Sequence, residues 1–200
     1  MSSQTAPLGR PGLAVWLRSL GGCLAAGLIV GIVVAGFGSR LVMRLLAVAD
    51  PDAEGVITEN GNRVGEITLA GTGALVGFTG IFSGVAAGLI VFGVRRWLPA
   101  RLIWSGLALS VVLLALLGGL VLDPDNFDFR LLEPAGLAVA LFGALFFAAG
   151  YALAPLADRL APDVPRFLFR RDLTIAGGTA MAVAVGFGLV QVAEAILELV

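Results

Sequence analysis

Charged residues are absent from five long stretches of this chain, and this absence constrains the fold more than any other feature. Each stretch is rich in Leu, Val, Ala, Ile, Phe and Gly, and together they cover residues 19–39, 67–94, 102–122, 134–157 and 173–193. About 20 apolar residues in a helix cross the hydrocarbon core of a bilayer. The pattern therefore predicts an all-α polytopic membrane bundle with five transmembrane helices.

The composition agrees with this fold class. Hydrophobic residues make up 58% of the chain and charged residues 14%, whereas a soluble domain carries about 25% charge. We expect a disordered cytoplasmic tail at residues 1–12, followed by a single transmembrane domain over residues 13–200. Its predicted spans cover about residues 13–38, 70–94, 102–122, 134–155 and 173–196.

The first apolar pattern runs past Arg40 to about Ala49. At 1.5 Å per residue this is too long for one perpendicular span. The helix is expected either to project from the membrane or to bend near Gly36 and Gly38.

The arginines predict the orientation. The 13 basic residues, all Arg, divide into nine on the side of the N-terminus and four on the other side, where eleven of the 14 acidic residues also lie. Because cytoplasmic loops carry the excess of basic residues, the N-terminus is predicted inside and the C-terminus outside. Trp16, Trp97 and Trp104 fall at the predicted cytoplasmic boundary, where an indole ring is favoured.

A short external β-hairpin is predicted between the first two helices. Residues 56–59 and 62–65 flank Asn60 and Gly61, and Asn-Gly is the preferred dipeptide of a type I′ turn. Two strands alone are marginally stable. We therefore expect the hairpin to pack on the outer end of the bundle.

A stripe of glycines marks the second predicted helix. The intervals of four and three residues put these glycines on one helix face, and they are Gly73, Gly77, Gly80, Gly84 and Gly88. Small residues let helix backbones approach closely in lipid. We expect helix packing here, within the bundle or, as the alternative, between copies in a homo-oligomer or along a narrow pathway.

Two pairs of charges are predicted at the outer boundary. Arg40 and Arg44 are spaced i, i+4 in the first helix, as are Glu194 and Glu198 in the last, so each pair lies on one helix face. The hypothesis is that these pairs meet. Asp50, Asp52, Glu133 and lipid phosphates are rival partners for the arginines, and an anion or substrate site is a further alternative.

The residues offer little for catalysis. The chain has no His, no Lys and one cysteine, Cys23, so the usual proton shuttle and the Schiff-base amine are missing. The loop with Asp123, Asp125 and Asp128 has too little of the calcium-loop pattern to predict a metal site. We expect no enzyme activity, no cofactor, no metal and, with a net charge of −1, no nucleic-acid partner.

Three segments carry a resemblance: Gly38 to Leu45, Thr58 to Glu66 and Asp125 to Pro134. With them, the chain resembles a family of uncharacterised actinobacterial integral membrane proteins over roughly residues 35–155. The resemblance implies a membrane location and transfers no site residues. It suggests that the outer-face segments, more than the spans, make the protein distinctive.

The function predicted from the sequence is that of an accessory or structural protein of the bacterial plasma membrane. It would bind a protein partner or lipid through its outer face. The expected contact residues are Arg40, Arg44, Glu59, Asn60, Arg63, Glu66, Asp128, Glu194 and Glu198. The alternative is a small-solute or ion transporter or channel that forms oligomers through its glycine-rich faces.

Overall fold

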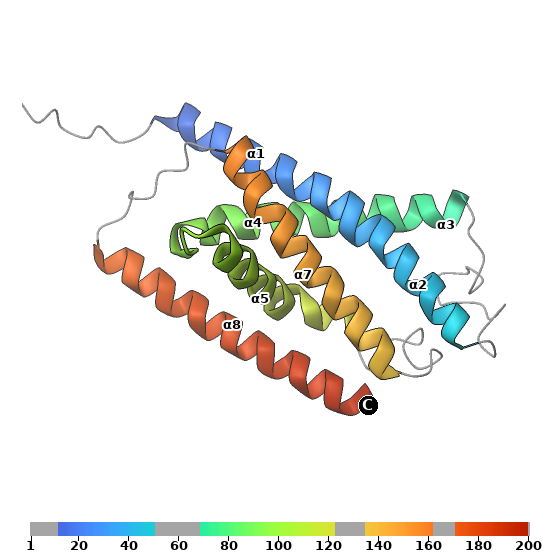
Figure 1. Ribbon diagram of the computed structural model, residues 1–200. Helices are drawn as coiled ribbons and strands as arrows, with labels where there is room; N and C mark the ends of the chain where they lie inside the picture. Colours follow the sequence, from blue (N-terminus) through green and yellow to red (C-terminus); the bar gives the residue numbers. More distant parts are fainter. Residues whose placement is uncertain (1–11, 51–68, 123–134, 162–170, 200) are drawn as a thin grey trace, which may run out of the picture.

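The computed structural model describes residues 12–50, 69–122, 135–161 and 171–199, and every regular element in them is a helix (Figure 1). The predicted hairpin and all but one residue of the predicted tail lie outside these ranges. In chain order the elements are α1 (Leu13–Val30), η1 (Gly31–Phe37), α2 (Gly38–Ala49), α3 (Leu69–Ala74), η3 (Leu75–Gly80), α4 (Ile81–Val94), η4 (Arg95–Trp97), α5 (Leu102–Val121), α7 (Ala135–Leu160) and α8 (Arg171–Leu199).

Five helical stretches of the described chain are long and apolar enough to cross a membrane. They are Leu13–Ala49, Val76–Trp97, Leu102–Val121, Ala135–Leu160 and Ile175–Leu199. Their mean hydropathies lie between 1.9 and 2.3, so length and composition both agree with the five-helix prediction.

The first stretch continues beyond residue 38 as one helix of 37 residues. The π-helical turn η1 joins α1 to α2 without a break in the helix, and Figure 1 shows the three segments following one another along a single course. Of the two predicted outcomes, a projecting helix therefore describes the structure better than an interrupted one. A π-helical segment widens a helix locally without ending it.

The fourth span was predicted over about residues 134–155, and the helix that contains it, α7, continues through Pro155 to Leu160. Proline lacks an N–H group and clashes with the carbonyl four residues earlier, which breaks many helices. In apolar helices such a proline is tolerated where neighbouring groups satisfy the freed backbone.

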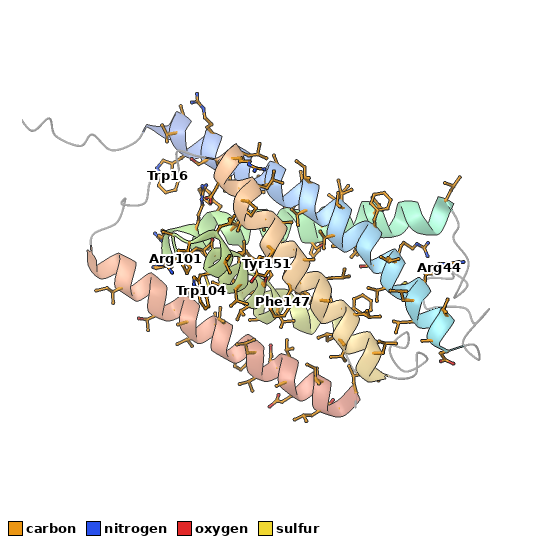
Figure 2. All side chains as sticks on the ribbon, viewed as in Figure 1. Trp16, Arg44, Arg101, Trp104, Phe147 and Tyr151 are labelled. Atoms are coloured by element: carbon orange, nitrogen blue, oxygen red, sulfur yellow. The ribbon has the colours of Figure 1, made fainter. Side chains whose placement is uncertain are left out.

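The helices pack in an ordered series. α1 lies between α4 and α7, α7 lies between α1 and α5, and α8 packs mainly on α5 (Figure 1). We call one end of this bundle the tryptophan end, because Trp16 and Trp104 lie there together with Trp97. The opposite end, where Arg44 lies, is called the Arg44 end (Figure 2).

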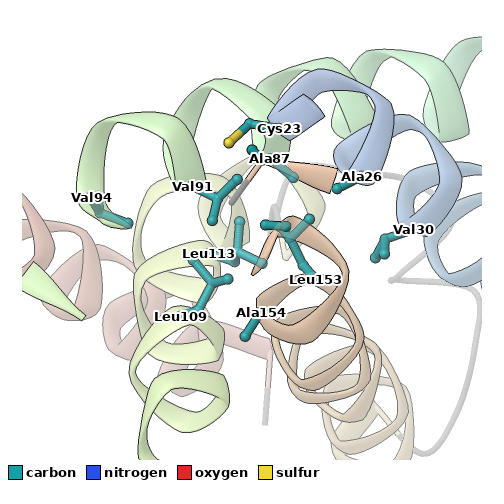
Figure 3. Close-up of a cluster of buried hydrophobic side chains, with 12 residues drawn as sticks. Cys23, Ala26, Val30, Ala87, Val91, Val94, Leu109, Leu113, Leu153 and Ala154 are labelled. Atoms are coloured by element: carbon teal, nitrogen blue, oxygen red, sulfur yellow. The ribbon is translucent and has the colours of Figure 1, made fainter. Parts of the chain in front are cut away.

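Two apolar clusters hold the helices together. The larger joins α1, α4, α5 and α7 (Figure 3) and contains Cys23, Ala26, Val30, Ala87, Val91, Val94, Leu109, Leu113, Leu153, Ala154, Ala157 and Ala161. The smaller lies toward the Arg44 end and contains Val42, Leu46, Leu122, Ala138, Phe142 and Val192. Alanine and valine dominate the larger cluster, so the backbones lie close together.

The outer surface of the bundle is apolar as well. Phe78 on η3, Val183 on α8 and Val33 on η1 are 77%, 66% and 57% exposed. Soluble monomers rarely expose contiguous apolar surface on this scale. Such a surface is suited to contact with lipid chains.

Candidate functional site

The outer-face residues predicted from the sequence fall into two groups. Glu59, Asn60, Arg63, Glu66 and Asp128 lie outside the residues that the structure describes. The other four are described: Arg40 and Arg44 lie on α2, and Glu194 and Glu198 lie near the end of α8. Figure 2 shows Arg44 projecting from α2 at the end that bears its name.

Arg40 is the most unusual of these side chains. It is partly buried, and its Nε and Nη2 atoms are shielded from solvent without a hydrogen-bond partner in the described structure. A guanidinium carries five N–H donors and stays charged. Leaving a buried donor unsatisfied costs about 1–3 kcal/mol, and more when the group is charged. Arg40 is therefore a candidate for contact with an acceptor that the described residues do not supply.

The predicted pairing of Arg40 and Arg44 with Glu194 and Glu198 is not seen among the described residues. All four side chains are described, and no ion pair joins α2 to α8 among the described residues. The two helices share the smaller apolar cluster through Val42, Leu46 and Val192. The i, i+4 spacing determines which face of each helix carries the charges. It does not determine which helix packs against that face.

The glycine stripe packs against α1 and η1 over three of its five members. A Cβ atom built at Gly84 or Gly88 would lie within 3.0 Å of α1 backbone atoms, and one at Gly80 would lie 3.1 Å from the Cα of Ile32. A Cβ at Gly73 or Gly77 would meet nothing within 4 Å. Packing within the bundle is therefore seen for the later part of the stripe and not for its first two glycines, for which contact between copies stays a prediction.

The same contact requires glycine on α1. A Cβ atom at Gly27 or Gly31 would overlap backbone atoms of Gly80, Gly84 and Gly88. The two backbones thus approach as closely as small-residue motifs allow in lipid-facing helices. No side chain can enter this part of the interface.

Ser110 joins α5 to α7 deep in the bundle. Its side chain is fully buried, and its hydroxyl lies 2.9 Å from the Gly106 carbonyl and 3.2 Å from the Phe147 carbonyl. A Cβ at Gly150 would overlap Ser110. A hydroxyl and a glycine backbone thus fix the spacing of these helices.

An ion pair joins Arg95 and Asp158 at the tryptophan end. The Arg95 Nη2 donates to the Asp158 Oδ1 at 2.6 Å, and the Arg95 Nη1 donates to the Ala161 carbonyl. The Arg95 side chain is 14% exposed and that of Asp158 is 57% exposed. The contact joins η4 to the last turn of α7, and it was not predicted from the sequence. The available signal was that both residues fall at the same predicted membrane boundary.

Aromatic contacts reinforce this end. The Arg96 guanidinium lies 3.9 Å from the centroid of the Trp97 ring, within the range of a cation–π interaction. The Trp97 ring also lies beside Gly177 and Gly178 at the start of α8. Trp16 packs edge-on against Phe92, with ring centroids 5.7 Å apart.

The described chain offers no arrangement of nucleophile and base. Cys23 is fully buried in the larger apolar cluster, beside Arg95 (Figure 3). One turn earlier, Ser19 is 1% exposed and its hydroxyl has no hydrogen-bond partner in the described part of the chain. Within the described ranges no three His, Cys, Asp or Glu side chains come together as metal ligands.

Comparison with known proteins adds no relative. No protein-family model, no curated protein and no solved structure matches this chain. The resemblance to an actinobacterial membrane-protein family therefore stays a prediction.

Proposed function

We propose that this chain is a five-pass integral protein of the bacterial plasma membrane, with its N-terminus in the cytoplasm and its C-terminus outside. The apolar surface of the five long helices supports insertion. The division of the arginines into nine and four supports the orientation. Trp16, Trp97 and Trp104 gather at one end of the bundle, which supports a membrane interface there.

Its role in this proposal is accessory: the protein is not an enzyme, and it binds a protein partner or a lipid through its outer face. The observation that carries the proposal is the guanidinium of Arg40, whose shielded Nε and Nη2 atoms lack a hydrogen-bond partner in the described structure. By the proposed orientation Arg40 lies at the outer boundary. An acidic side chain or a phosphate from a bound molecule would supply the missing acceptor.

The packed interior supports this role over transport. The buried polar side chains among the described residues are four serines, Ser19, Ser39, Ser105 and Ser110. α1 and α4 meet backbone to backbone at their glycines. A transport pathway is normally marked by ionisable groups within the membrane or by a water-filled cavity, and the described core is built of alanine, valine and leucine.

Native mass spectrometry of the protein, extracted gently from its host membrane, tests this proposal. We expect a co-purifying protein or a stoichiometric lipid with the wild type, and its loss with Arg40→Gln. The control is Arg18→Gln, which removes an exposed arginine at the opposite end of the same long helix. A bare homo-oligomer for all three proteins would contradict the proposal and favour the transporter, to be tested by flux assays in liposomes.

A further inference from the structure

A groove opens between the first helix and α7, away from the outer-face residues. It encloses about 210 Å³. Four aliphatic side chains between residues 29 and 34 form one wall, and Ala152, Pro155, Leu156 and Arg159 form the other. The α7 residues follow one another at intervals of three, one and three, so they lie on a single face of this helix.

The groove has a closed floor and an open rim. Val30 at its base is 4% exposed, whereas Ile29 and Val33 are 49% and 57% exposed. The two helices touch on either side of it, because Gly22 packs on Leu160 toward one end and a Cβ at Gly38 would lie 2.8 Å from the Leu145 side chain toward the other. The groove therefore results from the way the first helix and α7 cross, and it opens to the side of the bundle.

Hydrocarbon suits this groove better than water. A bound water needs two to four polar partners. Of the eight lining side chains, only that of Arg159 is polar. The groove thus matches a flexible aliphatic chain along most of its length.

Arg159 supplies a charge at one end of the groove. It lies in the last turn of α7 and is exposed. Its side chain lines the groove at this end. The neighbouring carboxylate, Asp158, is already paired with Arg95 at 2.6 Å. No carboxylate within the described ranges forms an ion pair with Arg159.

We propose that this groove binds one acyl chain of an anionic phospholipid, whose phosphate pairs with Arg159. A guanidinium recognises phosphate through two parallel hydrogen bonds, and the apolar walls receive the chain below it. Arg159 lies at the tryptophan end, the level expected for lipid headgroups. This site is separate from Arg40 and does not depend on what binds the outer face.

Lipid titration of the purified, delipidated full-length protein tests the site by native mass spectrometry. The probes are phosphatidylglycerol and phosphatidylcholine with identical acyl chains. We expect the first phosphatidylglycerol to bind about tenfold more tightly than phosphatidylcholine, because phosphatidylcholine carries the same phosphate beside a choline cation that repels the guanidinium. Arg159→Gln should abolish this preference and Arg159→Lys should retain most of it.

Two further variants separate the site from general effects. Ala152→Phe places a ring in the groove from an exposed position, so it should weaken the binding of both lipids without unfolding the protein. Arg101→Gln removes an exposed arginine at the same end but outside the groove, and it should leave the preference unchanged. Equal affinity of the wild type for both lipids, or unchanged binding by Ala152→Phe, would overturn the proposal. So would an equal loss of preference with Arg101→Gln and Arg159→Gln.

Discussion

The Arg95 Nη2 lies 2.6 Å from the Asp158 Oδ1, and this contact joins two helix ends that are 63 positions apart in the chain. The Arg95 side chain is largely buried and also reaches the Ala161 carbonyl, whereas Asp158 is more than half exposed. The two partners therefore differ in what their removal costs. Loss of Arg95 leaves the end of α7 without its tie to η4, and loss of Asp158 leaves the bond to Ala161 in place.

Removal of the arginine should destabilise the bundle more than removal of the acid. We expect Arg95→Ala to lower the free energy of unfolding by about 1–3 kcal/mol and Asp158→Asn by about 0.5 kcal/mol, since solvent screens an exposed partner. Unfolding in mixed detergent micelles measures both. Arg101→Ala, at an exposed position of the same end, is the control and should change little. Equal losses for Arg95→Ala and Arg101→Ala would show that the ion pair does not hold this end.

A methyl group at the α1–α4 crossing should be costly. Gly27→Ala forces a Cβ against the backbone of Gly84 and Gly88, and such overpacking costs about 1–3 kcal/mol. Gly21→Ala on the same helix meets open space, so it should be neutral or stabilise the helix by up to about 1 kcal/mol. The same unfolding assay compares them. The packing described for Gly27 would be refuted if both variants shifted stability in the same direction.

The Ser110 hydroxyl should make a measurable contribution across the α5–α7 interface. Ser110→Ala removes the bond to the Phe147 carbonyl, and interhelical hydrogen bonds in membranes are worth about 0.6 kcal/mol on average. The Thr179 hydroxyl bonds only within its own helix, at an exposed position, so Thr179→Ala serves as the control. In thermal unfolding in detergent, Ser110→Ala should have a lower unfolding temperature than Thr179→Ala. The reverse order would contradict a stabilising hydrogen bond from Ser110 to the Phe147 carbonyl.

The proposed orientation predicts which new cysteines can be labelled in intact cells. Cys23 is fully buried, so replacement by alanine provides a silent background. In that background Glu198→Cys should react with a membrane-impermeant maleimide added outside, because the proposed orientation places the end of α8 outside. Arg101→Cys should react only after the cells are permeabilised. The opposite labelling pattern would invert the topology and place Arg40 on the cytoplasmic side.

The number and approximate limits of the helices were predictable because uncharged apolar segments of this length have few alternative structures to a membrane-spanning helix. The end of the fourth span was predicted near residue 155, whereas α7 continues through Pro155 to Leu160, although proline breaks many helices. In the same way, apolar periodicity alone did not decide between a bend and a projection after Gly38.

The candidate sites were less predictable, because each depends on the register between helices. Their spacing puts Gly77 and Gly84 on one helix face. The contact with α1 includes Gly84 and does not extend to Gly77. Spacing also suggested Glu194 as a partner for Arg40, and no ion pair between them is seen among the described residues. The Arg95–Asp158 pair and the groove at Arg159 both depend on how α1, α4 and α7 pack together, which the sequence does not specify.

The central claim is that the outer face around Arg40 binds a specific molecule, and site-specific photo-crosslinking in living cells tests it most directly. A photoreactive residue at Leu41, which is 62% exposed beside Arg40, is compared with one at Leu17, which is 58% exposed at the opposite end. We predict a single defined adduct, protein or lipid, from position 41, and its loss when Arg40 is changed to glutamine. Identical adducts from both positions, or an adduct from position 41 that persists without Arg40, would contradict the claim.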